Sequence, residues 1–113
     1  MKVFCHHVYE YKKGLRNLVL HTTRGAHRPE IEEKLTREGI PYLIHPLGNG
    51  NINVFFGNEL CIEVVRRIAD KRLSDLTDEE DFILGIMLGY DRLQQCARYL
   101  KRKRKEDVGE LAG

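Results

Sequence analysis

A chain of 113 residues has the length of a single domain, and 42% hydrophobic with 32% charged residues is an ordinary globular composition. A net charge of +2 does not require a polyanionic partner. No apolar run approaches the ~20 residues of a membrane span, and the N-terminus lacks the apolar core of a signal peptide, so we expect a cytoplasmic protein. The wide spacing of the three cysteines, Cys5, Cys61 and Cys96, favours reduced thiols over disulfides.

Apolar residues in the opening segment recur at the spacing of one helix face: Phe4, Val8, Tyr11 and Leu15. The alternation at residues 3, 5, 7 and 9 would also allow a strand. The run 12–14, two lysines and a glycine, is typical of a helix end, so we predict a helix. Residues 17–23 are predicted as the first strand.

A second helix is predicted to begin near Pro29 and to bury Ile31 and Leu35. Gly39 fits the position just after a helix end, and we expect Ile40 to fold back on Leu35. Residues 40–57 then read as a hairpin, because segments 41–47 and 52–56 are rich in β-branched and aromatic residues. The four residues 48–51, Gly-Asn-Gly-Asn, tolerate positive φ and suit the turn.

After the hairpin, Asn58 is predicted to cap a third helix. That helix is expected to bury a stripe of Leu60 or Cys61, Val64, Val65 and Ile68. Thr77 and Glu80 fit a capping box at the start of an apolar helix that reaches residue 89. A polar segment, 90–103, either continues it as a kinked helix or forms a separate one. Residues 1–103 are predicted as one α+β domain, and 104–113 as a basic-to-acidic flexible tail.

The element order predicts an α+β fold. Its three-stranded sheet has a βαββα core, a ferredoxin-like split βαβ unit without the last strand, plus an N-terminal helix and C-terminal helices. A right-handed crossover makes the first two strands parallel and places the third between them, antiparallel to both. We expect the second and third helices to cover one face of the sheet. The N-terminal and C-terminal helices, a second copy of the chain, or both must then cover the other face.

The hairpin loop is one candidate site, because the amide groups of Asn49, Asn51 and Asn53 could form an anion-binding nest with the backbone. No Walker or dinucleotide-binding pattern is present, and a plain turn is the favoured interpretation.

A second candidate site lies in the C-terminal helices. Gly85 and Gly89 are four apart on one helix face, which indicates close packing, and we favour packing across a dimer. Ligand or partner contacts are predicted for Tyr90, Asp91, Arg92, Gln95 and Tyr99.

Cys5, His6 and His7 are the most metal-like cluster, but neighbours on a helix diverge. A metal site would need a further ligand from elsewhere: His21, His45 or Cys96. His21 and His45 could approach each other across the open face of the sheet. We predict no metal and no cofactor, and keep two alternatives: a metal- or thiol-dependent enzyme that uses Cys5, His6, His7 and Cys96, and nucleic-acid binding by the basic run 101–105.

Three segments, YEYKKGLRNLVL, GIPYLIHPLGNGNINVFFG and LTDEEDFILGIMLGYDRLQQCARY, carry a resemblance over roughly residues 1–103. The chain resembles a small, uncharacterised bacterial family of unknown function. The resemblance implies about three strands, five helices and a homodimer, and offers no catalytic residues. It also suggests that such proteins are often encoded beside a flavodoxin, and hence a redox accessory role.

Together these observations predict a cytoplasmic, homodimeric binding or regulatory protein that is not an enzyme and does not contact a membrane. Its working surfaces would be the hairpin, residues 40–57, and the helix at 90–99. If the flavodoxin suggestion holds, that acidic electron carrier would meet the basic C-terminal helix.

Overall fold

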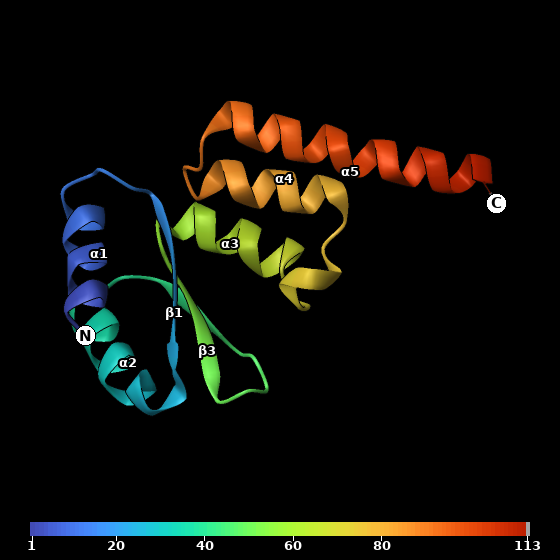
Figure 1. The fold of residues 1–113 in the computed structure, drawn as a ribbon. Helices are drawn as coiled ribbons and strands as arrows, with labels where there is room; N and C mark the ends of the chain where they lie inside the picture. Colours follow the sequence, from blue (N-terminus) through green and yellow to red (C-terminus); the bar gives the residue numbers. More distant parts are fainter. Residues whose placement is uncertain (113) are drawn as a thin grey trace.

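The computed structural model describes the backbone of residues 1–112 and the side chains of residues 1–107. Its elements follow the predicted order (Figure 1). They are α1 (Lys2–Lys12), β1 (Leu18–Arg24), α2 (Arg28–Arg37), β2 (Tyr42–Pro46), β3 (Asn51–Gly57), α3 (Glu59–Ile68), α4 (Asp78–Met87) and α5 (Arg92–Ala112), with short 3-10 turns at Gly25–His27 and Leu73–Asp75. The predicted α+β class is confirmed. Of the predicted tail 104–113, α5 includes the residues up to Ala112, and the side chains from 108 onward lie outside the described part of the chain.

The three strands form a sheet in the order β1-β3-β2, with β3 antiparallel to both neighbours. β1 and β2 therefore run parallel, and the predicted strand order is confirmed. The register pairs Asn53 of β3 with Thr22 of β1 and with His45 of β2. These three side chains consequently form one row across the sheet and share a face.

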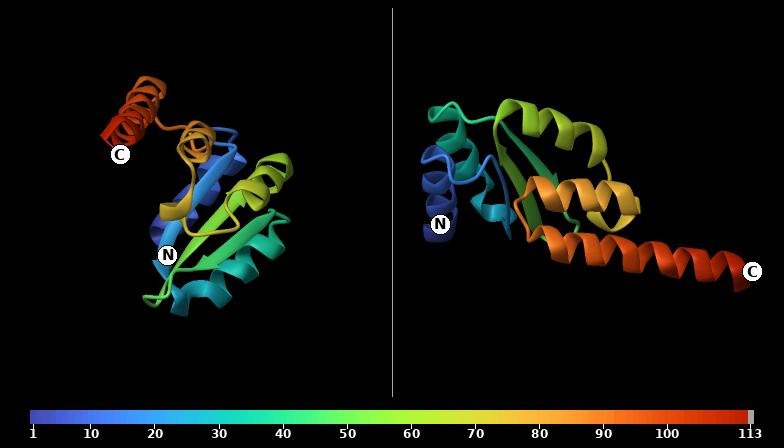
Figure 2. Two further views of the ribbon diagram at one scale, coloured as in Figure 1. Left: turned by 90° about the vertical axis from the view of Figure 1, so that its right-hand side faces the viewer. Right: turned by 90° about the horizontal axis from the view of Figure 1, so that it is seen from above.

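Helices cover both faces of this sheet (Figures 1 and 2). On one face, α1 and α2 form a core with alternate residues of β3: Phe4, Val8, Ile31, Leu35, Ile52, Val54 and Phe56. On the other face, α3 and α4 form a second core: Phe55, Ile62, Val65, Ala69, Leu76, Leu84 and Leu88. The prediction that α2 and α3 cover the same face is therefore wrong.

Packing of α1 explains why α3 takes the opposite face. Phe4 of α1 lies edge-on to Phe56, with ring centroids 5.6 Å apart, so α1 and α2 fill the first face together. A strand buried on both faces needs a continuous apolar run, and residues 54–56 supply one. His21 packs on the first face against Phe4, and His45 packs on the second against Phe55. The expected approach of His21 and His45 across one open face is wrong.

Local helix-end signals are confirmed. Gly39 has φ +68°, and the Ile40 N–H donates to the Leu35 carbonyl at 2.9 Å, which brings the two apolar side chains together in the core. Thr77 accepts from the Glu80 N–H at 3.1 Å, and the Glu80 carboxylate accepts from the Thr77 N–H at 2.9 Å. The capping box therefore starts α4 as predicted.

Two apolar stripes differ from the prediction. Leu15 is 70% exposed, because α1 ends at Lys12 and the chain turns at Gly14. In α3 the buried side chains are Ile62 and Val65, whereas Leu60 and Val64 are exposed. Cys61 and Ile68 pack on the same core as predicted, and with residues 62, 65 and 69 they form one helix face from which residues 60 and 64 are turned away.

The last two helices are separate and antiparallel. Gly89 adopts φ +81°, and the Tyr90 N–H donates to the Gly85 carbonyl at 3.1 Å, which closes α4 and reverses the chain. α5 lies along α4 on the side away from the sheet, and its C-terminal part projects past the body of the domain (Figures 1 and 2). Within the described residues, no helix combines the length and apolar character needed to cross a membrane.

Candidate functional site

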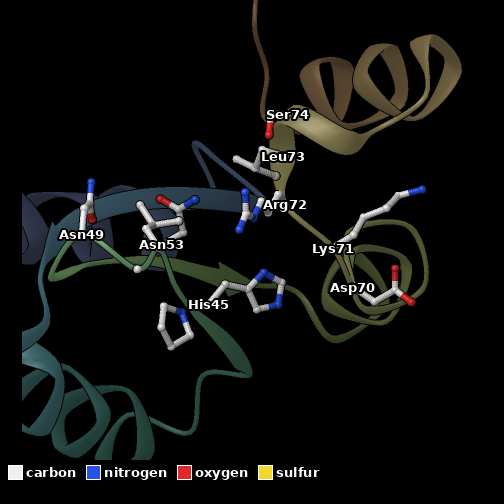
Figure 3. A pocket seen from close by; sticks show the side chains of 11 residues that line it. His45, Asn49, Asn53, Asp70, Lys71, Arg72, Leu73 and Ser74 are labelled. Carbon is white, nitrogen blue, oxygen red and sulfur yellow. The ribbon is translucent and has the colours of Figure 1, made fainter.

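An open cleft of about 840 Å³ lies between the β2–β3 hairpin and the connector that follows α3. The hairpin contributes His45, Asn49 and Asn53, together with apolar residues at its tip. The connector, residues 70–74, forms the opposite wall (Figure 3). The cleft thus joins two segments that are far apart in sequence, and it opens on the α3–α4 face of the sheet.

Asn53 is the only buried polar side chain in the described core, with 5% of its surface exposed. The Thr22 hydroxyl donates to its Oδ1 at 2.6 Å, which fixes the orientation of the amide. Within the described residues, Nδ2 makes no side-chain hydrogen bond, and no fully buried side-chain nitrogen or oxygen is left unpartnered. Nδ2 is therefore in contact with the cleft rather than sealed in the core, and it presents a donor there.

The charged side chains of the connector point in different directions. Figure 3 shows Arg72 directed toward the side of the cleft that carries Asn53 and His45, while Asp70 and Lys71 point away from it. Lys71 Nζ lies 2.7 Å from Glu80, which raises the pKa of Lys71. Among the described residues, Arg72 takes part in no ion pair. The cleft therefore receives hydrogen-bond donors and one positive charge.

The predicted hairpin site is divided by the structure. Asn49 and Asn53 line the cleft, but Asn51 does not. The Asn51 N–H donates to the Asn49 Oδ1 at 3.0 Å, so the amide of Asn49 closes its own turn. In addition, the Gly50 carbonyl accepts from the Gly25 N–H at 2.8 Å, which ties the turn to the end of β1. These hydrogen bonds fix the conformation of the hairpin turn. Arg72, on the opposite wall of the cleft, was not predicted as a site residue because the connector carries no sequence motif.

Ion pairs hold α5 on α4. Arg98 donates to both carboxylate oxygens of Asp81, at 2.8 and 3.1 Å, and this contact lowers the pKa of Asp81. Arg102 Nε lies 2.7 Å from Asp78. Because arginine and carboxylate match in a two-pronged geometry, these contacts fix the register of the two helices.

A second set of contacts centres on Glu79. Its carboxylate accepts from the Tyr99 hydroxyl at 2.7 Å and lies 2.9 Å from Lys103 Nζ. These two hydrogen bonds lower the pKa of Glu79 to about 2, with that of Lys103 the larger cause. Tyr99 also packs on Phe82, with ring centroids 5.4 Å apart. Since Arg102 and Lys103 both bind α4, part of the predicted basic run is neutralised within the chain.

Gly85 and Gly89, the predicted dimer-packing residues, have roles inside the chain. A Cβ on Gly85 would collide with the side-chain amide of Gln95, so α5 of the same chain occupies the space beside it. A Cβ on Gly89 would meet nothing within 4 Å, and its positive φ ends α4. The close approach that the sequence indicated is thus made by α5, and a role of either glycine in a dimer stays a prediction.

The predicted residues of segment 90–99 are only partly brought together. Tyr90 and Gln95 line a pocket of about 300 Å³ beside α4, whereas Asp91, Arg92 and Tyr99 do not line it. Asp91 caps α5, because its Oδ2 accepts from the Gln94 N–H at 2.9 Å. Tyr90 and Arg92 are exposed to solvent. Gln95 and Tyr99 contact α4 as described, so the segment mainly attaches α5 to the domain.

One side of the α4–α5 pair is apolar and exposed, and sequence reasoning missed it. We call this surface the apolar side of the helix pair. Its residues Phe82, Ile83, Cys96 and Leu100 line a groove, and Ile86 and Leu93 continue the same two helix faces by one turn. Leu93 is 79% exposed and Leu100 is 49% exposed. A groove of about 400 Å³ runs between the two helices here. The spacing of residues 93, 96 and 100 along one helix face was the available signal.

The metal-like cluster is not assembled into a site. Cys5, His6 and His7 lie on α1, on one side of the sheet, whereas Cys96 lies on α5, beyond α4 on the other side (Figure 1). His7 contacts Glu10 and Arg16 instead, at 3.3 Å each. Across the side chains that the structure describes, no three His, Cys, Asp or Glu residues are grouped to hold a metal ion.

A comparison with protein families identifies the family of the chain. A family described as proteins of unknown function (DUF2023) matches residues 2–102. The chain belongs to this family. The resemblance inferred from the three sequence segments is therefore confirmed as an uncharacterised family, and the matched range ends within α5. No functionally curated protein matches the chain.

Proposed function

We propose that this DUF2023 protein is a cytoplasmic, non-catalytic interaction protein that works as a homodimer joined through the apolar side of the helix pair. The exposure of that side carries the proposal. Leu93 and Leu100 on α5 and Ile83 on α4 are between 42% and 79% exposed, and they lie on neighbouring faces of packed helices. Contiguous exposed apolar side chains of this kind mark protein interaction surfaces. The free cysteines support a reducing compartment.

Two features favour a second copy of the chain as the occupant. Two antiparallel helices with one apolar side are half of a four-helix bundle, which a two-fold axis would complete. The part of α5 beyond Lys103 projects past α4 (Figure 2). A helix of that length is marginal alone, so contact with a partner would stabilise it.

The oligomeric state tests this proposal. The chain mass is 13.2 kDa, and light scattering coupled to size exclusion should return twice that value for the wild type. Leu93→Glu should convert the protein to monomer, because a charge is placed in the apolar contact. Gln94→Glu is the matched control: it adds the same charge to the first turn of α5 on an exposed polar position, and the dimer should persist. A monomeric wild type, or a dimeric Leu93→Glu, would refute the proposal.

An acidic protein is the proposed partner of the dimer. Lys101, Arg104 and Lys105 are exposed on α5, away from the contacts with α4, and they offer positive charge to a partner. The resemblance suggests that such proteins are often encoded beside a flavodoxin, and this suggestion makes that acidic carrier the first candidate. Calorimetric titration with a purified flavodoxin should show binding that weakens with salt.

A pair of charge variants makes the partner test specific. Lys101→Gln with Lys105→Gln should weaken binding, whereas Arg66→Gln with Arg67→Gln on exposed positions of α3 should leave it unchanged. Equal affinity for the two double variants would contradict the role of α5. This outcome would leave the dimer proposal standing, since neither pair lies on the apolar side.

A further inference from the structure

The cleft between the hairpin and the α3–α4 connector is separate from the proposed dimer surface. We propose that it binds a small organic carboxylate, held by Arg72 and Asn53 with His45 beside them. Binding there does not depend on the dimer, because none of these three residues belongs to the apolar side of the helix pair.

The charge balance of the cleft favours an anion. The lining includes three charged side chains: Asp70, Lys71 and Arg72. Lys71 is paired with Glu80 at 2.7 Å, and Figure 3 shows Asp70 and Lys71 turned away from the sheet. Arg72 is directed toward Asn53 and His45, and it makes no ion pair within the described part of the chain. A guanidinium without a carboxylate beside it, facing other donors, is complementary to an oxyanion.

Asn53 gives independent support for a ligand site. It interrupts the apolar strand sequence Ile52-Asn-Val-Phe-Phe56 at a position where only 5% of its surface is exposed. Burial of an amide in a core destabilises the fold unless its polar atoms are bonded. Thr22 satisfies Oδ1 at 2.6 Å, and Nδ2 is left as a donor to the cleft. A local departure from an apolar pattern of this kind is expected at a functional site.

The number of cations and the apolar wall select the ligand class. One guanidinium balances the single charge of a carboxylate, and its planar fork fits the two carboxylate oxygens. A phosphate monoester carries nearly two charges and calls for further cations. Beside these donors the cleft is lined by Pro46, Leu47 and Leu73, which suit a hydrocarbon body. At about 840 Å³ it has the size of a small-molecule site.

Titration with benzoate tests the assignment, using amide and side-chain nitrogen NMR signals of the full chain. A fragment of this size is expected to bind with a Kd on the order of 1 mM. Benzoate should shift the Asn53 side-chain amide and the Arg72 Nε signals, whereas benzamide, its neutral isostere, should not. Equal shifts with benzamide would overturn the recognition of charge. Tighter binding of inorganic phosphate than of benzoate would overturn the carboxylate class.

Substitution of the guanidinium completes the test. Arg72→Gln should raise the Kd for benzoate at least about tenfold, because a charged hydrogen-bond pair is lost. Arg72→Lys keeps the positive charge but loses the planar guanidinium, so its Kd for benzoate should lie between those of the wild type and Arg72→Gln. Arg66→Gln, at an exposed arginine on α3 that does not line the cleft, should bind as the wild type does. Wild-type affinity in Arg72→Gln would overturn the proposal, and wild-type affinity in Arg72→Lys would overturn the two-pronged geometry.

Discussion

Substitution of Gly57 by alanine is expected to destabilise the domain strongly. Gly57 has φ +152°, and a Cβ there would collide with the Asn17 carbonyl and lie 3.0 Å from the Leu18 Cα. The Asn17 carbonyl cannot move freely, because it accepts from the Asn58 N–H at 2.8 Å. Backbone strain of about 1–3 kcal/mol and overpacking of about 1–3 kcal/mol together predict a loss of roughly 3 kcal/mol. That is a large part of the ~5–15 kcal/mol that stabilises a typical domain.

The matched substitution, Gly85→Ala, is expected to have a small effect although its added Cβ would also collide with a neighbouring atom. The atoms in its way are the amide end of Gln95, which is flexible and can rotate aside. Alanine also gains about 1 kcal/mol of helix propensity over glycine, which offsets the lost contact. We therefore expect the free energy of unfolding to change by less than about 1 kcal/mol. The oligomeric state should not change, because Gly85 already packs on α5 of its own chain.

Urea unfolding followed by far-UV circular dichroism measures both changes, with unchanged m-values required for the comparison. A Gly57→Ala protein within about 0.5 kcal/mol of the wild type would refute the steric argument. A loss of more than about 2 kcal/mol in Gly85→Ala would show that Gln95 cannot yield. If Gly85→Ala became monomeric while keeping its stability, the glycine would lie in the dimer contact after all.

Three further changes follow from local contacts. Thr77→Ala should lower the free energy of unfolding in urea by about 1 kcal/mol, because the capping box at α4 is lost. Burial lowers the pKa of His21 from 6.5, so the neutral imidazole is favoured in the folded state. The contribution of His21 to the free energy of unfolding is therefore complete above pH 6.5 and falls as the pH drops below that value. In His21→Phe, the free energy of unfolding measured in urea should lack this dependence on pH. Since the pKa of Glu79 is lowered to about 2, its contacts should persist at pH 5 and be lost as the pH falls from 4.5 toward 2, visible in the Tyr99 ring NMR signals.

Features set by short-range contacts could be predicted from the sequence. The closure of α2 needs only Gly39 at positive φ and an apolar Ile40 to meet Leu35, all within six residues. The capping box at Thr77 is equally local. The strand order could be predicted from chain connectivity. In a split βαβ unit, β1 and β2 run parallel and β3 lies between them, antiparallel to both.

The face chosen by α3 could not be predicted in the same way. It depends on whether α1 or α3 packs beside α2, and Phe4 decides this by its contact with Phe56, more than fifty residues away in the chain. The sequence held an indirect signal, since β3 lacks the alternation of apolar and polar residues that a strand with one solvated face shows.

The cleft could not be predicted from the sequence for a related reason. Arg72 belongs to a connector without periodicity, and only the folded chain brings it opposite Asn53.

Three residues break the local pattern of the element that holds them, and the structure accounts for them unequally. Gly85 weakens α4, but the side chain of Gln95 fills the space beside it, so the chain itself supplies the explanation. Asn53 interrupts an apolar strand, and Thr22 accounts for its oxygen while its nitrogen opens to the cleft. Leu93 is different, because it is 79% exposed next to an apolar groove. Contacts within the chain account fully for Gly85, for only one polar atom of Asn53, and not at all for the exposure of Leu93. The need for an external partner is therefore greatest at the apolar side of the helix pair.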